Sequence, residues 1–310
     1  MNRYVITSGN KYLDIDAYSS MIAYRELLNM QGKRAVAISH APLNESVPSL
    51  IQKLNYHLDQ DRINEEDRII IVDVSNPAMF DSVIVKEQIT EIIDHHTGFE
   101  AFWKEQHVIS QIESIGSVCT ILFEKFVEAN LQNNLDQPLC KLLVAGILDN
   151  TLNLKADITT DRDRKAYQQL LQIGKIDSDW YKAYFSACQN YIETHLKDIL
   201  ETSLKSEWVC PLLPPTFGQL LILNSTFIQQ YQQQITSFMN QKYEEWIFNF
   251  ICLEEEKSYL FISKKGQEVA QLLKIKCVEN TIIVSPFILR KELIKKAREF
   301  DQKKFKKEKE

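Results

Sequence analysis

The sequence contains no CxxC pair, no two adjacent glycines among its eight, and no long apolar run. Its six cysteines are far apart in the chain: Cys119, Cys140, Cys188, Cys210, Cys252 and Cys277. This spacing favours buried free thiols over a disulfide framework or a thiolate zinc site. Because no run of about 18 apolar residues occurs and residues 1–14 lack the apolar core of a signal peptide, we expect a soluble, cytoplasmic protein without a membrane span.

Basic residues are also fewer than acidic ones. The chain has 36 Lys and Arg against 42 Asp and Glu, a formal net charge of -6 and a pI near 5.7. This balance offers no basic footprint for duplex nucleic acid or an anionic membrane. Local groups must therefore hold any anionic ligand.

The length of 310 residues and a hydrophobic content of 45% predict two domains. In the first 150 residues, the apolar runs 3–9, 33–39, 68–75 and 89–96 alternate with segments of helical periodicity, among them 17–32 and 47–58. Strands that are apolar on both faces and separated by helices predict a parallel sheet covered on two sides. We place the first domain at 1–190, including a helical connection at its end, and a smaller α/β domain at 191–310.

Acidic residues follow three of the predicted strands. Asp14 and Asp16 come after the first strand, Asp73 ends the run "RIIIVD", and the segment 94–96 (Asp-His-His) ends "ITEIID". The carboxyl ends of parallel strands meet at one edge of a sheet, so these groups are expected to converge. Close carboxylates repel each other unless cations lie between them, and oxygen with imidazole is a donor set of Mn, Mg, Co or Fe. We therefore expect a pair of divalent cations.

Several motifs resemble a known family. The segments "GNKYLDIDAYSS", "IIIVD", "EIIDHHTG", "SIGSVCTILFEKF" and "AGILDNTLNLKADITTDRD" are similar to the successive motifs of the DHH phosphoesterase superfamily. Near the C-terminus, "IIVSPFILRKELI" resembles the Arg-Lys element of the DHHA2 domain of family II inorganic pyrophosphatases, exopolyphosphatases and Prune proteins. The resemblance implies a parallel-sheet DHH domain, a smaller α/β DHHA2 domain, and an active site in the cleft between them.

The resemblance also implies metal ligands. Asp14 and Asp16 would each bind a different cation, Asp73 would bridge both, and His95 would complete one site. Asp94 would orient an imidazole by a hydrogen bond, as metal-binding histidines commonly require. The expected cations are Mn²⁺ first, with Mg²⁺ or Co²⁺ as alternatives.

The substrate-binding residues implied by the resemblance are His96, Arg290 and Lys291. His96 would face a substrate phosphate and act with Asp73 in catalysis, while Arg290 and Lys291 would hold further phosphates. Lys205 could match a phosphate-binding lysine of the family, although an exposed helical lysine explains it better.

Three positions depart from the family pattern. The pyrophosphatases have a histidine where this chain has Asn10, and the exopolyphosphatase and Prune branch has asparagine there. Asn150 stands where a metal-binding aspartate belongs, and Asp149 could replace it only if the helix end shifted. Ser285 lies five residues ahead of Arg290, whereas the closest relatives have a contiguous Ser-Arg-Lys-Lys.

Helix-start signals occur near these motifs. Gly116 and Ser117 open a predicted helix, and either anion binding at its amides or ordinary packing explains them. Thr160 and Asp163 fit a capping box.

We predict a metal-dependent phosphohydrolase that cleaves phosphoanhydride bonds, with short polyphosphate as the expected substrate. Inorganic pyrophosphatase and nucleotide phosphodiesterase activities are the alternatives, and the scarcity of glycine weighs against an oligoribonuclease. Because of Asn150, an anion-binding or protein-binding module with weak or no turnover is the alternative of another class. A homodimer is left open.

Overall fold

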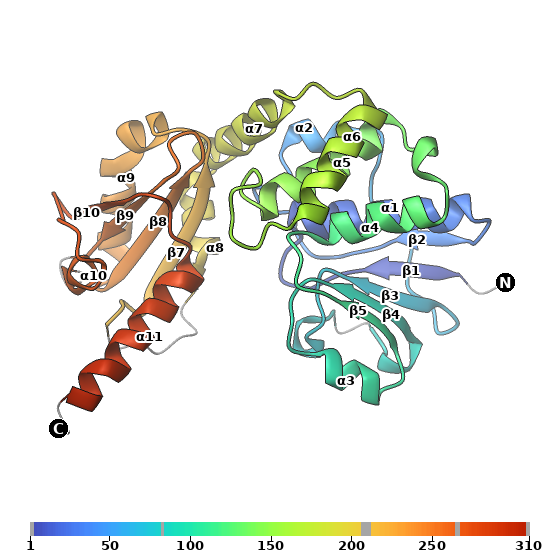
Figure 1. Ribbon diagram of the computed structural model, residues 1–310, viewed down its shortest axis with the longest axis horizontal. Helices are drawn as coiled ribbons and strands as arrows, with labels where there is room; N and C mark the ends of the chain where they lie inside the picture. The colour runs from blue at the N-terminus through green and yellow to red at the C-terminus, as the bar shows by residue number, and fades with distance from the viewer. Residues whose placement is uncertain (1–2, 82–83, 206–211, 264–266, 308–310) are drawn as a thin grey trace. The chain divides into compact units, whose positions relative to one another are not determined.

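The computed structural model describes residues 3–81, 84–205, 212–263 and 267–307, without the side chains of 267 and 302–307. The chain folds into two compact units, Met1–Ala187 and Cys188–Glu310, each built around its own sheet (Figure 1). The first unit contains all the acidic and histidine residues singled out above.

The sheet of the first unit has five strands, all parallel, in the order β2-β1-β3-β4-β5. Its strands are β1 (Tyr4–Thr7), β2 (Ala35–Ala37), β3 (Arg68–Val72), β4 (Ile89–Asp94) and β5 (Ile109–Ile112). Residues 69–72 of β3 are buried without interruption, because helices cover both faces of the sheet. This confirms the predicted α/β class and parallel sheet.

Helices flank this sheet on two sides (Figure 1). The helices are α1 (Ile15–Met30), α2 (Ser49–Gln52), α3 (Glu100–Glu105), α4 (Val118–Glu128), α5 (Gln137–Asn150) and α6 (Asp161–Gly174), with 3₁₀ turns at Pro77–Met79, Lys86–Gln88 and Gln132–Asn134. α1 packs on β1, β2 and β3, α4 packs on β4, and α3 lies against β5. α5 packs on α1, α4 and α6, which places its C-terminal end near the start of α1.

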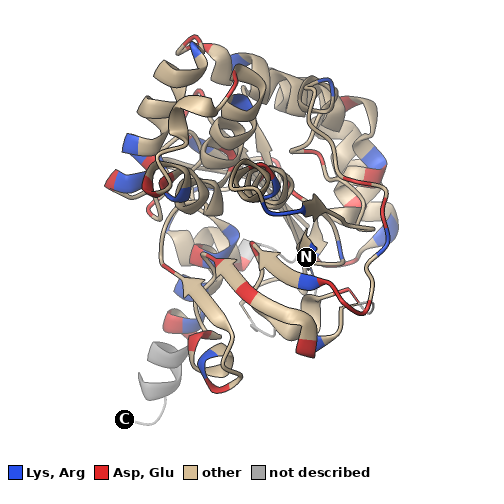
Figure 2. Ribbon diagram, turned by 90° about the vertical axis from the view of Figure 1, so that its right-hand side faces the viewer, with Lys and Arg blue, Asp and Glu red and all other residues tan. Residues whose placement is uncertain are grey.

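Charged residues of both signs are interspersed along the helices and loops of the two units (Figure 2). Within the described parts of the chain, every helix is too short or too polar to cross a bilayer. The described cysteines are thiols, as predicted, and Cys119, Cys140, Cys188 and Cys252 are buried whereas Cys277 is half-buried. Cys210 lies outside the described residues.

The second unit begins with the end of α7 (Trp180–Thr194) and contains a five-stranded mixed sheet in the order β10-β9-β8-β7-β6. Its elements are α8 (Leu196–Thr202), β6 (Leu204–Lys205), β7 (Thr216–Ile222), α9 (Thr226–Lys242), β8 (Trp246–Cys252), β9 (Lys257–Ile262), α10 (Gln267–Leu273), β10 (Thr281–Val284) and α11 (Arg290–Lys307). β7 and β8 are parallel and the other pairs are antiparallel.

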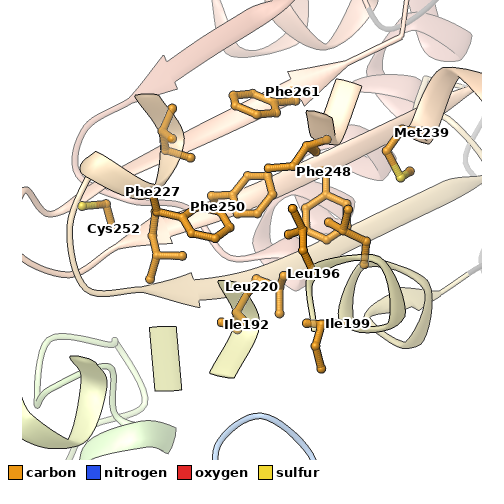
Figure 3. Packing of buried hydrophobic residues seen from close by; sticks show 14 of the residues in the cluster. Ile192, Leu196, Ile199, Leu220, Phe227, Met239, Phe248, Phe250, Cys252 and Phe261 are labelled. Carbon is orange, nitrogen blue, oxygen red and sulfur yellow. The ribbon is translucent and has the colours of Figure 1, made fainter. Parts of the chain in front are cut away.

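Two apolar cores lie on opposite faces of this second sheet. Phe248 and Phe250 of β8 pack with Phe227 of α9 and residues of α7 and α8, as Figure 3 shows. Ile247 of β8 belongs to the other core, with residues of α10 and α11. The alternation along β8 follows from the two-residue period of a strand.

The predicted elements differ from the structure at four places. The helix expected near 47–58 is only α2, β5 and α3 were not predicted, and Lys205 lies in strand β6 instead of a helix. β6 pairs with β7, Lys205 opposite Phe217, so tertiary pairing decides this segment.

Candidate metal centre

The carboxyl ends of three neighbouring strands carry the candidate ligands. β1, β3 and β4 are adjacent in the sheet. Asp14 caps the start of α1 after β1, Asp73 follows β3 directly, and His95 follows β4. Asp73 has a positive φ of 61°, an uncommon backbone conformation for a residue other than glycine. The parallel topology thus brings together residues that are more than 80 positions apart in the chain.

Asp73 and His95 face each other through two acceptor atoms. The Asp73 Oδ1 and His95 Nε2 atoms are 3.4 Å apart, and both side chains are buried. His95 Nδ1 lies 3.1 Å from the carbonyl oxygen of Ile115, which can only accept, so Nδ1 carries a proton, and Nε2 has a lone pair whenever the ring is neutral. Asp73 Oδ1 has no hydrogen-bond partner among the described residues. This arrangement requires a proton or a cation between the two atoms.

The surrounding carboxylates also favour a proton or a cation at Asp73. Burial first, and then the charges of Asp14, Asp16 and Asp94 and a hydrogen bond to Asp14, raise the pKa of Asp73 well above its usual value. Burial also raises the pKa of Asp14, against the hydrogen bond that it accepts from Ala17 N at 3.0 Å. A divalent cation would replace the shared proton. Carboxylate and imidazole donors fit Mn²⁺, Mg²⁺ or Co²⁺.

His96 and Asp94 form a second part of the centre. Asp94 Oδ1 accepts from His96 Nδ1 at 2.9 Å and from the backbone amides of His95 and His96. The side chain of His96 is 65% exposed, and Asp73, His95 and His96 can offer ligand atoms within 4.8 Å of one another. Asp94 therefore orients His96, whereas the Ile115 carbonyl orients His95.

The hydrogen bond between Asp94 and His96 changes the pKa of both. Burial alone would raise the pKa of Asp94, but hydrogen bonds from His96 and Ser75 lower it. Loss of water around His96 would lower its pKa, but Asp94 and the negative charges of Asp14 and Asp16 raise it. His96 is thus protonated at higher pH than a free histidine.

Asp16 lies in a different environment. It is fully buried, and its carboxylate accepts hydrogen bonds from Ser117 Oγ at 2.7 Å, Val118 N at 2.9 Å, Cys119 N at 3.0 Å and Asn150 Nδ2 at 2.5 Å. The anion at the start of α4 is therefore the side chain of Asp16. Gly146 permits the close approach of α5, because a Cβ there would lie 2.4 Å from Cys119 Sγ and 3.2 Å from Asp16 Oδ1.

The remaining candidates of the first unit have protein partners. Asp149 Oδ1 accepts from the hydroxyl of Tyr184 at 3.1 Å, and burial raises the pKa of Asp149 to about 7. Asn10 Nδ2 donates to the Phe80 carbonyl at 3.0 Å. Asn10 thus connects the loop after β1 to the loop after Pro77–Met79.

Three basic candidates come together within the second unit. Lys205 is paired in register with Phe217, and Arg290 Nη1 donates to the carbonyl oxygens of Phe217 at 3.1 Å and Ser203 at 3.3 Å. Lys291, the next residue of α11, is exposed.

Sequence reasoning missed several partners of these residues. The Ile115 carbonyl, the Cys119 amide and the Tyr184 hydroxyl carried no local signal, because their partners are distant in sequence. Ser117 was noted as a helix start, but its link to Asp16 spans 101 positions. The capping box of α6 is confirmed, with Thr160 and Asp163 in reciprocal hydrogen bonds.

Comparison with known proteins finds a family match within the first unit. Residues 4–147 match the DHH family, N-terminal domain. The resemblance to this family noted in the sequence is thereby confirmed for residues 4–147. The DHHA2 resemblance of the second unit stays a prediction.

Individual relatives are distant. A Lactobacillus johnsonii protein described as a probable manganese-dependent inorganic pyrophosphatase is 26% identical over 205 residues. That match spans 64% of this chain and 64% of the relative's length.

Two solved structures share the fold. A Methanococcus jannaschii protein described as a candidate family II inorganic pyrophosphatase superposes with a TM-score of 0.67 and 18% identity, over 96% of this chain and 99% of that one. An exopolyphosphatase-related protein from Bacteroides fragilis gives a TM-score of 0.54 and 16% identity, over 97% of this chain and 91% of that one.

Proposed function

We propose that this protein is a divalent-cation-dependent phosphohydrolase that cleaves phosphoanhydride bonds, with short inorganic polyphosphate as its substrate. One observation carries the proposal: the buried acceptor atoms Asp73 Oδ1 and His95 Nε2 face each other 3.4 Å apart, and Oδ1 finds no donor among the described residues. Such a pair costs free energy in a protein without a bound cation, and is expected where a cation binds.

Asp14, Asp73 and His95 would hold the cation. The name of the Lactobacillus johnsonii relative favours Mn²⁺, and the donor set also accommodates Mg²⁺ and Co²⁺. When bound, a divalent cation acts as a Lewis acid that polarises a phosphoryl oxygen and lowers the pKa of a coordinated water. The Ile115 carbonyl keeps the proton of His95 on Nδ1, so that Nε2 remains available to the cation.

His96 would contact the substrate. Asp94 Oδ1 lies 2.9 Å from His96 Nδ1 and raises the pKa of His96, which favours the positively charged form of this exposed ring. A protonated imidazole can donate a hydrogen bond to a phosphate oxygen and offset its charge. Asp94 therefore acts through His96 as a positioning residue.

We also propose the basic residues of the second unit as phosphate-binding groups. The bonds from Arg290 Nη1 to Phe217 and Ser203 fix the orientation of the guanidinium. Lys205 and Lys291 are exposed at this end of the second sheet. Several cationic groups suit a substrate with more than two phosphates.

Two observations bear on the number of phosphates in the substrate. Asn10, in the place where the pyrophosphatase pattern has histidine, favours polyphosphate over pyrophosphate. The name of the Lactobacillus johnsonii relative favours pyrophosphate as the second candidate.

The test is a substrate panel. Phosphate release from tripolyphosphate, pyrophosphate and a dinucleotide is measured with Mn²⁺, Co²⁺ and Mg²⁺, and we expect the highest kcat/KM with tripolyphosphate and Mn²⁺. Asp73→Asn is the inactive variant, and Asp179→Asn, an exposed acid-to-amide change, is the matched control. No phosphate release from any substrate with any metal would contradict the proposal and favour the anion-binding module.

A further inference from the structure

The carboxylate of Asp16 is saturated by hydrogen bonds. Oδ1 accepts from Ser117 Oγ and Cys119 N, and Oδ2 accepts from Val118 N and Asn150 Nδ2. An ionised carboxylate offers about four lone-pair directions. The four bonds therefore occupy the acceptor capacity of Asp16, and the side chain is fully buried.

The charge of Asp16 is already compensated by the protein. Two of its donors are backbone amides of the first turn of α4, where the helix dipole is positive. Gly146 allows α5 to approach this point closely. The third side of the carboxylate is covered by Asn150, the last residue of α5, whose amide nitrogen lies 2.5 Å from Oδ2.

Asn150 supplies a donor where an aspartate would supply a second negative charge. Two ionised carboxylates at that separation cannot persist side by side without a cation or a proton. The amide group, similar in shape, removes the repulsion and needs no cation. The Asn150 amide thus donates a hydrogen bond to the Asp16 carboxylate at the position where an aspartate would repel it.

Asp73, in contrast to Asp16, has an oxygen that accepts no hydrogen bond within the described part of the chain. Its Oδ1 has no donor among the described residues, and it faces the His95 Nε2 atom. The first unit therefore contains the pair of Asp73 and His95, which calls for a cation, and the pair of Asp16 and Asn150, which an amide hydrogen bond satisfies.

We propose that this protein binds one divalent cation per chain, at Asp73 and His95, and that the Asn150 amide takes the place of a second cation beside Asp16. This inference rests on the proposed function, because that function supplies the first cation. The sequence predicted two divalent cations, and this inference reduces their number to one.

The test counts bound Mn²⁺ in the full-length protein. Equilibrium dialysis with metal analysis is expected to give about one Mn²⁺ per wild-type chain and about two per Asn150→Asp chain. Electron paramagnetic resonance adds an independent signature, because two Mn²⁺ ions about 4 Å apart are magnetically coupled and one isolated ion is not. The wild-type spectrum is expected to be that of isolated Mn²⁺, and the Asn150→Asp spectrum that of a coupled pair.

Two further variants complete the experiment. Asn150→Ala removes the amide without adding charge and is expected to keep about one Mn²⁺, whereas Asp73→Asn is expected to bind none. Two coupled ions in the wild type would overturn the inference, whether or not Asn150→Asp folds. Two ions with full turnover would leave the proposed function intact, and one ion without turnover on any substrate would overturn the proposed function alone.

Discussion

Asp16 and Asp73 are both buried acids near the same sheet edge, yet their surroundings differ. Asp16 accepts four hydrogen bonds from α4 and Asn150, whereas Asp73 Oδ1 has no donor among the described residues and faces a histidine nitrogen. The hydrogen bonds of Asp16 stabilise the fold. The Oδ1 atom of Asp73, opposite a histidine nitrogen, requires a cation or a proton. A buried carboxylate thus indicates a ligand only when the protein leaves its oxygens unsatisfied.

The largest expected effect comes from Asp73→Asn. Asparagine keeps the shape and tolerates the left-handed backbone at this position, but it removes the anionic ligand. We expect Mn²⁺-dependent phosphate release to fall at least on the order of 100-fold. Loss of a residue that only hydrogen-bonds a metal ligand typically lowers activity by about 10- to 100-fold, and loss of a ligand itself should cost more. Steady-state rates and Mn²⁺ titrations measure this, with Asp179→Asn as the control.

The stability of the same variant distinguishes Asp73 from Asp16. Because Asp73 Oδ1 has no donor to lose among the described residues, the metal-free Asp73→Asn protein should unfold at the same urea concentration as the wild type or a higher one. A marked loss of stability together with retained turnover would show that Asp73 is a structural residue.

Asp16→Asn should have the reverse signature. Its new amide nitrogen would replace one acceptor oxygen and face two of the four donors, either Ser117 Oγ and Cys119 N or Val118 N and Asn150 Nδ2. We therefore expect the free energy of unfolding to fall by about 2–4 kcal/mol. Urea denaturation of the metal-free protein measures the change. An unaltered midpoint would mean that the α4 contacts of Asp16 contribute little, and that its environment does not differ from that of Asp73.

Asp94→Asn should change the pH dependence more than the stability of the metal complex. Without the negative charge beside it, the pKa of His96 falls towards that of a free histidine. The alkaline limb of kcat/KM should therefore move to lower pH, with a loss of about 10-fold at neutral pH. An unchanged pH profile would exclude a protonated His96 from substrate binding.

The last effect concerns Asp149. Burial raises its pKa to about 7 in the folded protein, against about 3.9 in the unfolded chain. The folded state therefore holds a proton that the unfolded state releases, and stability in the metal-free protein is lost as pH rises from about 4 through about 7. The slope is at most about 1.4 kcal/mol per pH unit for one proton.

Asp149→Asn should reduce this slope, since the amide does not titrate. Urea midpoints measured between pH 5 and pH 8 give the comparison. A wild-type midpoint that rises with pH over this range, in the absence of metal, would contradict the assignment of a raised pKa to the buried carboxyl groups.

The strand ends of the first unit could be predicted from the sequence. The run 69–72 is buried without interruption, and the topology of parallel strands fixes where the residue after it must lie. The pattern of apolar runs is therefore enough to place Asp73 and His95 at one edge of the sheet. β5 was not predicted, because it has four residues at the edge of the sheet and Ile109 is 71% exposed.

The partner of Asp16 could not be predicted in the same way. Ser117 and Asn150 are separated from Asp16 by 101 and 134 positions, and both contacts depend on how α4 and α5 pack. The sequence shows asparagine at position 150 in place of the expected aspartate. That its amide nitrogen points to Asp16 follows only from the packing of α5. Lys205 was misplaced for the same reason, since pairing with Phe217 decides its strand conformation.

Crystals grown with Mn²⁺ test the binding of a cation at Asp73 most directly. An anomalous difference map at the manganese edge should show one peak bonded to Asp73 Oδ1 and His95 Nε2, and none at Asp16. A map with no peak at Asp73 at saturating Mn²⁺, or with the ion bonded to Asp16 instead, would contradict it.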